Sequence, residues 1–316
     1  MDMRKKIFID GAEGTTGLNI FDRLKSRKDL EIITLNNKDR KEINSKIEIM
    51  KDVDLTIQCL PDQASKQIYE IIKDFENIRV IDASSAHRVH PDFVYGFQEM
   101  AENQKKNIHN AKYVSNPGCY PTGFISLIRP LVEKKLLCNS SKLIASCVSG
   151  YSGGGKSLIN EFENKKQINF ALYGLNFDHK HLPEMKKYSL LKSNPLFMPS
   201  VSNFYQGMLV TIPLHSSQLN KNISSADIIE FYKDFYKHYP LIKISSSQDI
   251  NERGFLFPDK NIGLDQLEIF VFSNKIDDQI LIVARLDNLG KGACGSAIQN
   301  LNLMLGFEDY CGLKIK

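Results

Sequence analysis

One cysteine stands in a setting that favours nucleophilic chemistry. Cys119 follows the turn-forming run Asn116, Pro117 and Gly118, and Pro121 suits the first position of the helix predicted next. A thiol just before a helix faces unpaired N–H groups and the positive end of the dipole, which stabilise the thiolate. The remaining cysteines fall in apolar strands, at helix ends or near the terminus. Cys119 is therefore the predicted nucleophile.

A nucleophilic cysteine normally works with a histidine that handles the proton. The stretch "FDHKHLPEM" supplies His179 and His181, beside Glu184. The H-x-x-x-H spacing of a zinc helix is missing and no cysteine lies nearby, so no metal site is expected. The other histidines are interpreted as surface or capping residues: His87, His90, His109, His215 and His238.

A glycine-rich turn between a predicted strand and a predicted helix favours nucleotide binding. Gly11, Gly14 and Gly17 in "FIDGAEGTTGLNIFDRL" have the spacing G-x-x-G-x-x-G. Such a turn lets the backbone approach a pyrophosphate closely, and the N–H groups of the helix start face the anion. The alternative is a plain glycine-rich turn.

The residues after the second predicted strand bear on the choice of cofactor. Enzymes that use NAD place an acidic residue there to bind the ribose 2′-hydroxyl. This chain has Asn36 and Asn37, followed by Lys38 and Arg40. The missing carboxylate and the nearby cations favour NADP, and a solvated charged loop is the alternative.

A second glycine-rich stretch, "GYSGGGKS" from Gly150 to Ser157, matches the phosphate-binding pattern G-x-x-x-x-G-K-[ST]. A protein with a working loop of this kind usually opens its domain with it. Here the stretch falls in mid-chain, after a complete strand–helix–strand unit with a phosphate-type turn of its own. We therefore do not expect an ATP site.

The elements that must position these residues change in character near residue 116. Before it, strand and helix patterns alternate, which is typical of a parallel sheet with helices on both faces. After it come long β-branched strands, which favour an antiparallel sheet. The last segment is again helical and is expected to pack back onto the first domain. The predicted fold is α/β followed by α+β.

Composition limits the class of protein. The chain has 316 residues, 42% hydrophobic content and a net charge of +4, which is ordinary for a globular protein. No basic run has the density of a nucleic-acid footprint, and no apolar run is long enough for a signal peptide or a membrane span. We expect a cytoplasmic protein with a small anionic ligand and no nucleic-acid or membrane partner.

Four stretches together resemble one family. "SNPGCYPTG", "VSGYSGGGK", "HKHLPEM" and "LDNLGKGACGSAIQNLNLMLG" follow one another as in the N-acetyl-γ-glutamyl-phosphate reductases, closest to their shorter subgroup. The resemblance implies a Rossmann-type NADP-binding domain (1–116 and 290–316), completed by the C-terminal helix. It also implies an α+β catalytic domain (117–289) like that of aspartate-semialdehyde dehydrogenase, and a homodimer or homotetramer.

The resemblance also assigns roles. The family's nucleophile falls on Cys119, its paired histidines fall on His179 and His181, and its phosphate-pairing arginine falls on Arg88. One departure is "YGFQEM", where Gln98 stands in place of the usual proline and leaves the role of that loop open. Other implied ligands are Asn116 and Glu184 for the substrate, and Gly11, Gly14, Thr15, Thr16, Gly17, Ser84, Ser152, Gly153, Gly154 and Asn288 for the cofactor.

The implied reaction begins when Cys119 attacks an acyl phosphate and phosphate leaves beside Arg88. NADPH then reduces the thioester, and His179 or His181 supplies the proton. Four alternatives remain: a carrier-protein reductase of lysine biosynthesis, an aspartate-semialdehyde dehydrogenase, a kinase using Lys156 and Ser157, and an inactive nucleotide sensor. The sequence leaves open which histidine is the acid, and which of Lys38 and Arg40 meets the 2′-phosphate.

Overall fold

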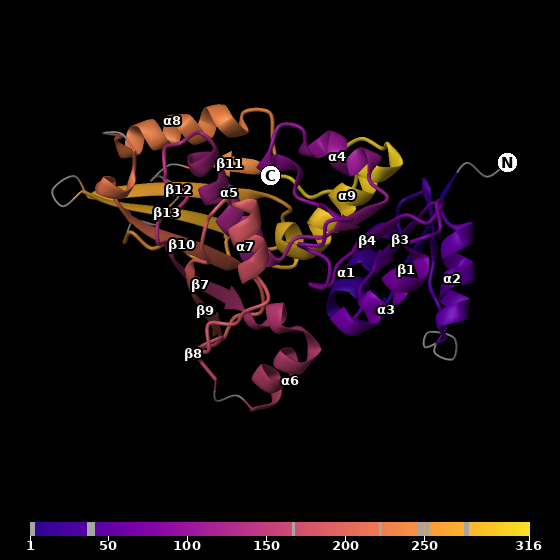
Figure 1. The fold of residues 1–316 in the computed structure, drawn as a ribbon. Helices are drawn as coiled ribbons and strands as arrows, with labels where there is room; N and C mark the ends of the chain where they lie inside the picture. Colours follow the sequence, from indigo (N-terminus) through magenta and orange to yellow (C-terminus); the bar gives the residue numbers. More distant parts are fainter. Residues whose placement is uncertain are drawn as a thin grey trace. The chain divides into compact units, whose positions relative to one another are not determined.

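The chain forms two compact units in the computed structural model (Figure 1). One unit is Met1–Pro117 with Ala293–Leu313, and the other is Gly118–Gly292 with Lys314–Lys316. We describe each unit by itself. The structure describes residues 4–36, 42–165, 168–220, 223–245, 250, 253–274 and 278–316.

The first unit contains a six-stranded sheet in the order β2-β1-β3-β4-β6-β5, and every pairing is parallel. Strands buried on both faces of a parallel sheet read as continuous apolar runs, as Ile7, Phe8 and Ile9 do. The strands are β1 (Lys5–Asp10), β2 (Leu30–Ile33), β3 (Leu55–Gln58), β4 (Val80–Asp82), β5 (Val94–Tyr95) and β6 (Tyr113–Ser115).

Helices cover both faces of this sheet, because its strands alternate side chains between two apolar cores. Ile7 and Ile9 pack in one core with Ile298 of the C-terminal helix. Phe8 packs in the other core with Ile68. This is the predicted doubly wound α/β arrangement. The helices are α1 (Thr15–Leu24), α2 (Ile43–Asp52), α3 (Asp62–Ile72), α4 (Gln104–Asn110) and α9 (Gly295–Leu305), with a 3-10 turn η2 (Gln98–Met100).

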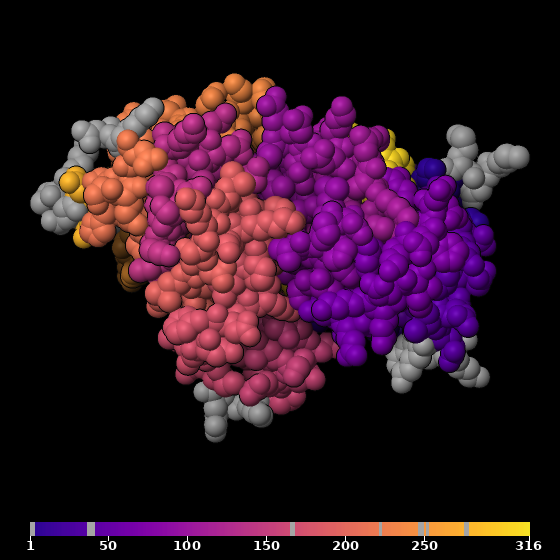
Figure 2. Space-filling model, in the orientation of Figure 1, coloured from indigo at the N-terminus to yellow at the C-terminus, as the bar shows by residue number. Residues whose placement is uncertain are grey.

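The C-terminal helix α9 belongs to the first unit, as expected for a segment that completes it. Every residue of α9 from Gly295 to Met304 is buried. Only a few yellow atoms are visible on the face that Figure 2 shows. None of the helices within the described ranges is long and apolar enough to cross a membrane.

The second unit contains a seven-stranded sheet in the order β11-β12-β13-β10-β7-β9-β8. We predicted an antiparallel sheet, and this was wrong in part. The pairs β10–β13 and β12–β13 are antiparallel, but β7–β9 and β11–β12 are parallel, so the sheet is mixed. The strands are β7 (Ile144–Gly150), β8 (Phe170–Leu172), β9 (Leu196–Ser202), β10 (Met208–His215), β11 (Ile242–Ile244), β12 (Leu267–Asn274) and β13 (Gln279–Leu286).

Helix α5 packs tightly on one face of the mixed sheet. A Cβ atom on Gly123 would lie 2.7 Å from a methyl group of Val210, so only glycine allows this approach. Helix α8 packs beside α5, and the Tyr232 hydroxyl donates to the Leu127 carbonyl at 2.5 Å. The helices are α5 (Cys119–Glu133), α6 (Gly155–Lys165), α7 (Leu182–Tyr188) and α8 (Ser225–Tyr236), with 3-10 turns η3 (Tyr151–Gly154) and η4 (Ser216–Gln218), and a π-helical turn (Gly290–Cys294) leads into α9.

Candidate active site

Cys119 is the first residue of α5. Gly118 is the N-cap with extended backbone angles (φ −73°, ψ 152°), and within the described residues no side chain caps the helix and no acid lies in its first turn. The prediction that Pro121 begins the helix was wrong, because the helix starts two residues earlier. Cys119 therefore lies within the first turn, where the dipole of the helix favours negative charge.

The paired histidines lie at the start of α7 in the same unit. Their ring centroids are 4.7 Å apart, and the backbone N–H of His181 donates to Nδ1 of His179 at 3.2 Å. The ring of His181 is 6.0 Å from that of Tyr120, the neighbour of Cys119. Burial, followed by the adjacent Tyr173 hydroxyl, raises the pKa of Tyr120, so this phenol stays protonated.

Glu184 ties α7 directly to the cysteine turn. Its side chain is fully buried, and Oε2 accepts the backbone N–H of Gly118 at 3.1 Å. The contact is one residue before the thiol, so Glu184 fixes the backbone from which Cys119 projects. We expected Glu184 to bind substrate, and its geometry adds a positioning task.

Gly292, in the π-helical turn before α9, packs closely against Cys119. A Cβ atom on Gly292 would lie 2.8 Å from the Cβ of Cys119, so glycine is required there. The approach is fixed by Asp287, whose carbonyl accepts the Gly292 N–H at 2.9 Å and whose carboxylate accepts from Gln206 at 2.6 Å. Sequence reasoning missed Gly292 and Asp287, although both fall in a stretch that carried the resemblance.

The structure brings together three residues expected to bind the cofactor. Asn288 donates to the Ser152 hydroxyl at 2.9 Å and accepts the Gly207 N–H at 2.8 Å. A Cβ on Gly153 would lie 3.6 Å from the Asn288 amide nitrogen. Gly154 packs instead against Leu158. The loop "SGG" and the segment that follows β13 are therefore held together within the second unit.

The first three residues of "GYSGGGKS" use their backbone N–H groups within the protein. The N–H groups of Gly150, Tyr151 and Ser152 all donate to carbonyls of the segment 204–207, each at 3.0 Å. A phosphate-binding loop needs such groups pointing at the ligand. These three N–H groups are therefore used within the second unit, and the position of the stretch in the chain remains the argument against an ATP site.

The glycine turn of the first unit is packed so closely that two of its positions require glycine. Gly11 has φ +86°, and a Cβ there would collide with the Cys59 carbonyl oxygen. A Cβ on Gly17 would collide with the Gly11 carbonyl oxygen. Gly14 is the N-cap of α1, which opens with Thr15 and Thr16 and, among the described side chains, has neither a cap nor a first-turn acid.

A buried ion pair beside this turn was not anticipated. Lys46 of α2 reaches both carboxylate oxygens of Asp10, at 2.8 and 2.9 Å, at the end of β1. Burial raises the pKa of Asp10, and Lys46 opposes that shift. The pair neutralises a carboxylate that would otherwise repel an anion at Gly11. Of the residues expected to choose the cofactor, Asn36 is exposed, while Asn37, Lys38 and Arg40 lie outside the described residues.

The remaining predicted ligands lie in the first unit. Arg88 is buried, and its Nε donates to the Asn116 carbonyl at 3.0 Å. The Asn116 side chain donates to the Ala293 carbonyl at 2.9 Å and accepts from Asn300 at 3.2 Å. These contacts give Asn116 an architectural task in the first unit. Ser84 bonds to Asp82 through both its N–H and its hydroxyl, each at 2.8 Å.

Two of the other histidines differ in how well they were predicted. His109 was interpreted as a surface or capping residue, and its Nδ1 lies 2.8 Å from the Leu303 carbonyl near the end of α9. His87 was interpreted in the same way, and this was wrong. Its ring is buried, stacked on Phe93, and its Nδ1 lies 2.6 Å from Asp82.

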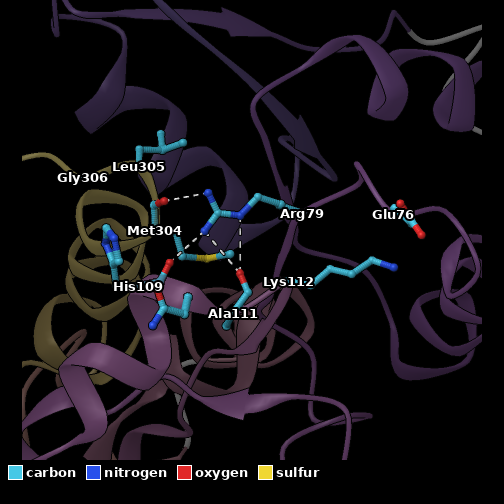
Figure 3. Close-up of a pocket in the computed structure, with 9 residues that line it drawn as sticks. Glu76, Arg79, His109, Ala111, Lys112, Met304, Leu305 and Gly306 are labelled. Atoms are coloured by element: carbon cyan, nitrogen blue, oxygen red, sulfur yellow. Dashed lines mark hydrogen bonds between the residues drawn. The ribbon is translucent and has the colours of Figure 1, made fainter.

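A hollow of about 480 Å³ in the first unit lies at the end of α9 (Figure 3). Arg79 crosses it and donates to the carbonyls of Met304, His109 and Ala111 at 2.7, 3.1 and 3.2 Å. Cations at a helix C-terminus stabilise its unpaired carbonyls. Arg79, which crosses this hollow, therefore holds the C-terminal end of α9 in place. In the part of the chain that the structure describes, no group of three acidic, histidine or cysteine residues could hold a metal ion.

Family comparison places this architecture in a known class. Residues 6–108 match the semialdehyde dehydrogenase NAD binding domain, and residues 119–288 match the semialdehyde dehydrogenase dimerisation domain. The chain is thus an oxidoreductase of the semialdehyde dehydrogenase family, and it belongs within it to the N-acetyl-gamma-glutamyl-phosphate reductases. The resemblance read from the sequence is confirmed.

Two relatives illustrate the match. The N-acetyl-gamma-glutamyl-phosphate reductase of Trichormus variabilis is 41% identical over 98% of this chain and 99% of its own length. That of Brucella anthropi is 42% identical over 96% of this chain and 99% of its own length.

Solved structures support the fold. Aspartate semialdehyde dehydrogenase II from Vibrio cholerae has a TM-score of 0.75 at 16% identity, covering 96% of this chain and 99% of that one. The aspartate semialdehyde dehydrogenase from Candida albicans, solved with NADP, has a TM-score of 0.64 at 15% identity, with coverages of 96% and 98%. Both likenesses bear on the fold alone.

Proposed function

We propose that the chain catalyses the reductive dephosphorylation of N-acetyl-γ-glutamyl phosphate to the semialdehyde, a step of arginine biosynthesis, through a thioester on Cys119. The name shared by its relatives supports the substrate. The observation that carries the chemistry is the start of α5, where the thiol occupies the first turn and buried Glu184 holds the Gly118 N–H.

The first chemical step is acyl transfer. The thiolate of Cys119 attacks the γ-carbonyl carbon, a carbon–sulfur bond forms, and the carbon–oxygen bond to phosphate breaks. Inorganic phosphate leaves with the bonding electrons, and Arg88 offers the positive charge that stabilises them. The acyl group remains as a thioester, which is more readily reduced than a carboxylate.

The second stage returns the enzyme to its starting state. The reduced nicotinamide, when bound, supplies the hydride that converts the thioester carbonyl to a tetrahedral alkoxide. His179 or His181 controls the proton at that oxygen, and the carbon–sulfur bond then breaks to release the aldehyde and the Cys119 thiolate. The backbone N–H of His181, which donates to Nδ1 of His179 at 3.2 Å, helps to orient the His179 ring.

The cofactor proposal is NADPH, held by a nucleotide-binding domain of residues 1–116 and 290–316. Gly11 and Gly17 form a tight turn that only glycine allows, since a Cβ there would meet backbone, and such a turn before a helix supports pyrophosphate binding. We propose that Ser84, Ser152, Gly153 and Asn288 also serve the cofactor, and that residues 117–289 form the catalytic domain. The absence of an acid at Asn36 favours NADP over NAD.

We also propose that the enzyme is a homo-oligomer, a dimer or tetramer. The face of the mixed sheet opposite α5 carries a band of apolar side chains that are 40% to 58% exposed. Such a patch commonly marks an interface between protein chains. Its residues are Ile144, Phe170, Leu172, Leu196 and Met198.

A direct absorbance assay tests the proposal. NADPH absorbance is followed with N-acetyl-γ-glutamyl phosphate, with aspartyl phosphate and with NADH in place of NADPH. We expect turnover with the first substrate and a kcat/KM at least about tenfold higher with NADPH than with NADH. Preference for aspartyl phosphate would contradict the substrate, and equal efficiencies with both cofactors would contradict the cofactor.

A further inference from the structure

A buried polar cluster at the end of β4 contains two residues, Asp82 and His87, to which the reaction described above gives no role. The carboxylate of Asp82 is fully buried and accepts four hydrogen bonds. The donors are the Ser65 hydroxyl at 2.8 Å, the N–H and hydroxyl of Ser84 at 2.8 Å each, and Nδ1 of His87 at 2.6 Å. A carboxylate surrounded by donors is held as an acceptor, so Nδ1 carries the ring proton.

The pair of Asp82 and His87 has the atoms of a catalytic acid–histidine pair but not the exposure of one. The His87 ring is 2% exposed. It stacks on Phe93 with centroids 4.3 Å apart and planes 5° from parallel, and Tyr69 packs 5.1 Å away. A ring enclosed in this way cannot meet a substrate atom. It can only act through the backbone that it holds.

That backbone is the short loop that ends at Arg88. Ser84 and His87 both bind the carboxylate of Asp82, so one side chain holds the loop at two positions. Arg88 is the next residue, and its Nε donates to the Asn116 carbonyl. The N–H of Asn116 in turn donates to the Asp82 carbonyl of β4 at 2.7 Å. The cluster thus fixes Arg88 from both sides.

We propose that Asp82 and His87 are positioning residues that set the places of Ser84 and Arg88 for cofactor and substrate. The inference rests on the proposed function, because that function assigns Ser84 to the cofactor and Arg88 to the phosphate. A displacement of about 1 Å in such a residue can lower catalytic efficiency about 100-fold, without any contact between the altered residue and the reacting atoms.

Two substitutions at His87 separate positioning from mere packing. His87→Leu removes the Nδ1 donor and keeps an apolar side chain beside Phe93. His87→Asn places an amide N–H near the position of Nδ1, so it can donate to Asp82. His90→Leu is the matched control, since His90 packs 5.1 Å from the same Tyr69 ring. Ser65→Ala removes one donor from the same carboxylate while leaving the histidine in place.

The experiment uses the full chain, with thermal unfolding to identify folded variants. We expect His87→Leu to raise KM for the acyl phosphate about 100-fold with a smaller change in kcat, and to weaken NADPH binding about tenfold. His87→Asn should recover most of both losses, and His90→Leu should change neither. Should His87→Leu fail to fold, Ser65→Ala decides, with an expected rise in KM of about threefold to tenfold.

Two results would overturn the inference. One is a folded His87→Leu, or Ser65→Ala in its place, with KM and NADPH affinity within twofold of wild type. The other is a folded His87→Asn as impaired as His87→Leu. If the wild type does not consume the acyl phosphate, the proposed function fails separately, and the binding of NADPH to wild type and variants still decides the role of His87.

Discussion

The starts of α1 and α5 are alike in backbone and unlike in what they do. Each helix begins after a glycine N-cap with extended backbone angles, and among the described side chains neither is capped nor has an acid in its first turn. The first residue is Thr15 in α1 and Cys119 in α5. Both ends favour negative charge, because the first N–H groups of a helix have no partners within it.

The starts of α1 and α5 differ in what surrounds the first N–H groups of each helix. At α1 the glycines bring backbone close to backbone at Gly11 and Gly17, which suits a bound pyrophosphate. At α5 the Gly118 N–H is already given to Glu184, and Gly292 crowds the cysteine. In our proposal, the start of α1 receives an anion of the cofactor and the start of α5 stabilises the thiolate of Cys119. The surroundings therefore decide the chemistry of the same local structure.

The largest expected effect is at the second of these helix starts. Cys119→Ala should lower kcat by at least about 10⁴-fold, because the covalent route is lost. NADPH affinity should stay within about threefold, since α1 is untouched. Stopped-flow turnover and fluorescence titration with NADPH measure the two quantities. Comparable losses of turnover and NADPH binding would show that the two helix starts do not act separately.

The reverse experiment alters only the first helix start. Gly11→Ala should weaken NADPH binding about 100-fold, since φ is +86° and the new Cβ meets the Cys59 carbonyl. Gly306→Ala is the control, because its φ is +74° but the nearest atom to a Cβ is 3.9 Å away. It should lose about 1–2 kcal/mol of stability and keep its NADPH affinity. Equal affinities for the two variants would refute the cradle.

A smaller effect is expected from the buried carboxylate behind Cys119. Glu184→Gln keeps an oxygen that can accept the Gly118 N–H but removes its charge, which weakens the bond by about 1 kcal/mol. We expect kcat to fall about tenfold and NADPH affinity to be unchanged. Glu133→Gln, at the far end of α5, should leave kcat as it is. An unaltered kcat in Glu184→Gln would mean that the turn holds its shape without this contact.

The smallest effect concerns the reactivity of the other thiols. Burial raises the pKa of Cys59 and of Cys147, so their thiolate fractions at neutral pH are small and grow only toward strongly alkaline pH. Cys138 is exposed, and its hydrogen bond with Ser140 lowers its pKa. Iodoacetamide at pH 7 should therefore modify Cys119 and Cys138 ahead of Cys59 and Cys147, as peptide mapping will report.

Cys138→Ser separates the two reactive thiols. The variant should keep full activity, and one remaining fast modification should track the loss of activity. Modification of Cys59 or Cys147 ahead of Cys119 in the folded enzyme is the outcome that contradicts the assignment of the nucleophile.

The start of α1 could be predicted from the sequence, and that of α5 to within two residues, because their signals are local. Glycine spacing after a strand and a cysteine after a proline–glycine turn each lie within a few residues. The burial of His87 was not predicted, because it depends on packing against Tyr69 and Phe93. The residues next to His87 in the sequence carry no signal of that packing. The parallel pairing of β7 with β9 was missed because alternation of side chains is the same in parallel and antiparallel strands. The contact of Gly292 with Cys119 joins distant parts of the sequence and had no local signal.

The central claim is that Cys119 forms the thioester. The most direct measurement mixes the enzyme with the acyl phosphate without NADPH, quenches rapidly and follows phosphate release and the mass of the Cys119 peptide. We predict a burst of phosphate stoichiometric with active sites and the acyl group on Cys119, both missing in Cys119→Ala. A wild-type enzyme that turns over with NADPH but gives no burst, or that carries the acyl group on another residue, would contradict the account.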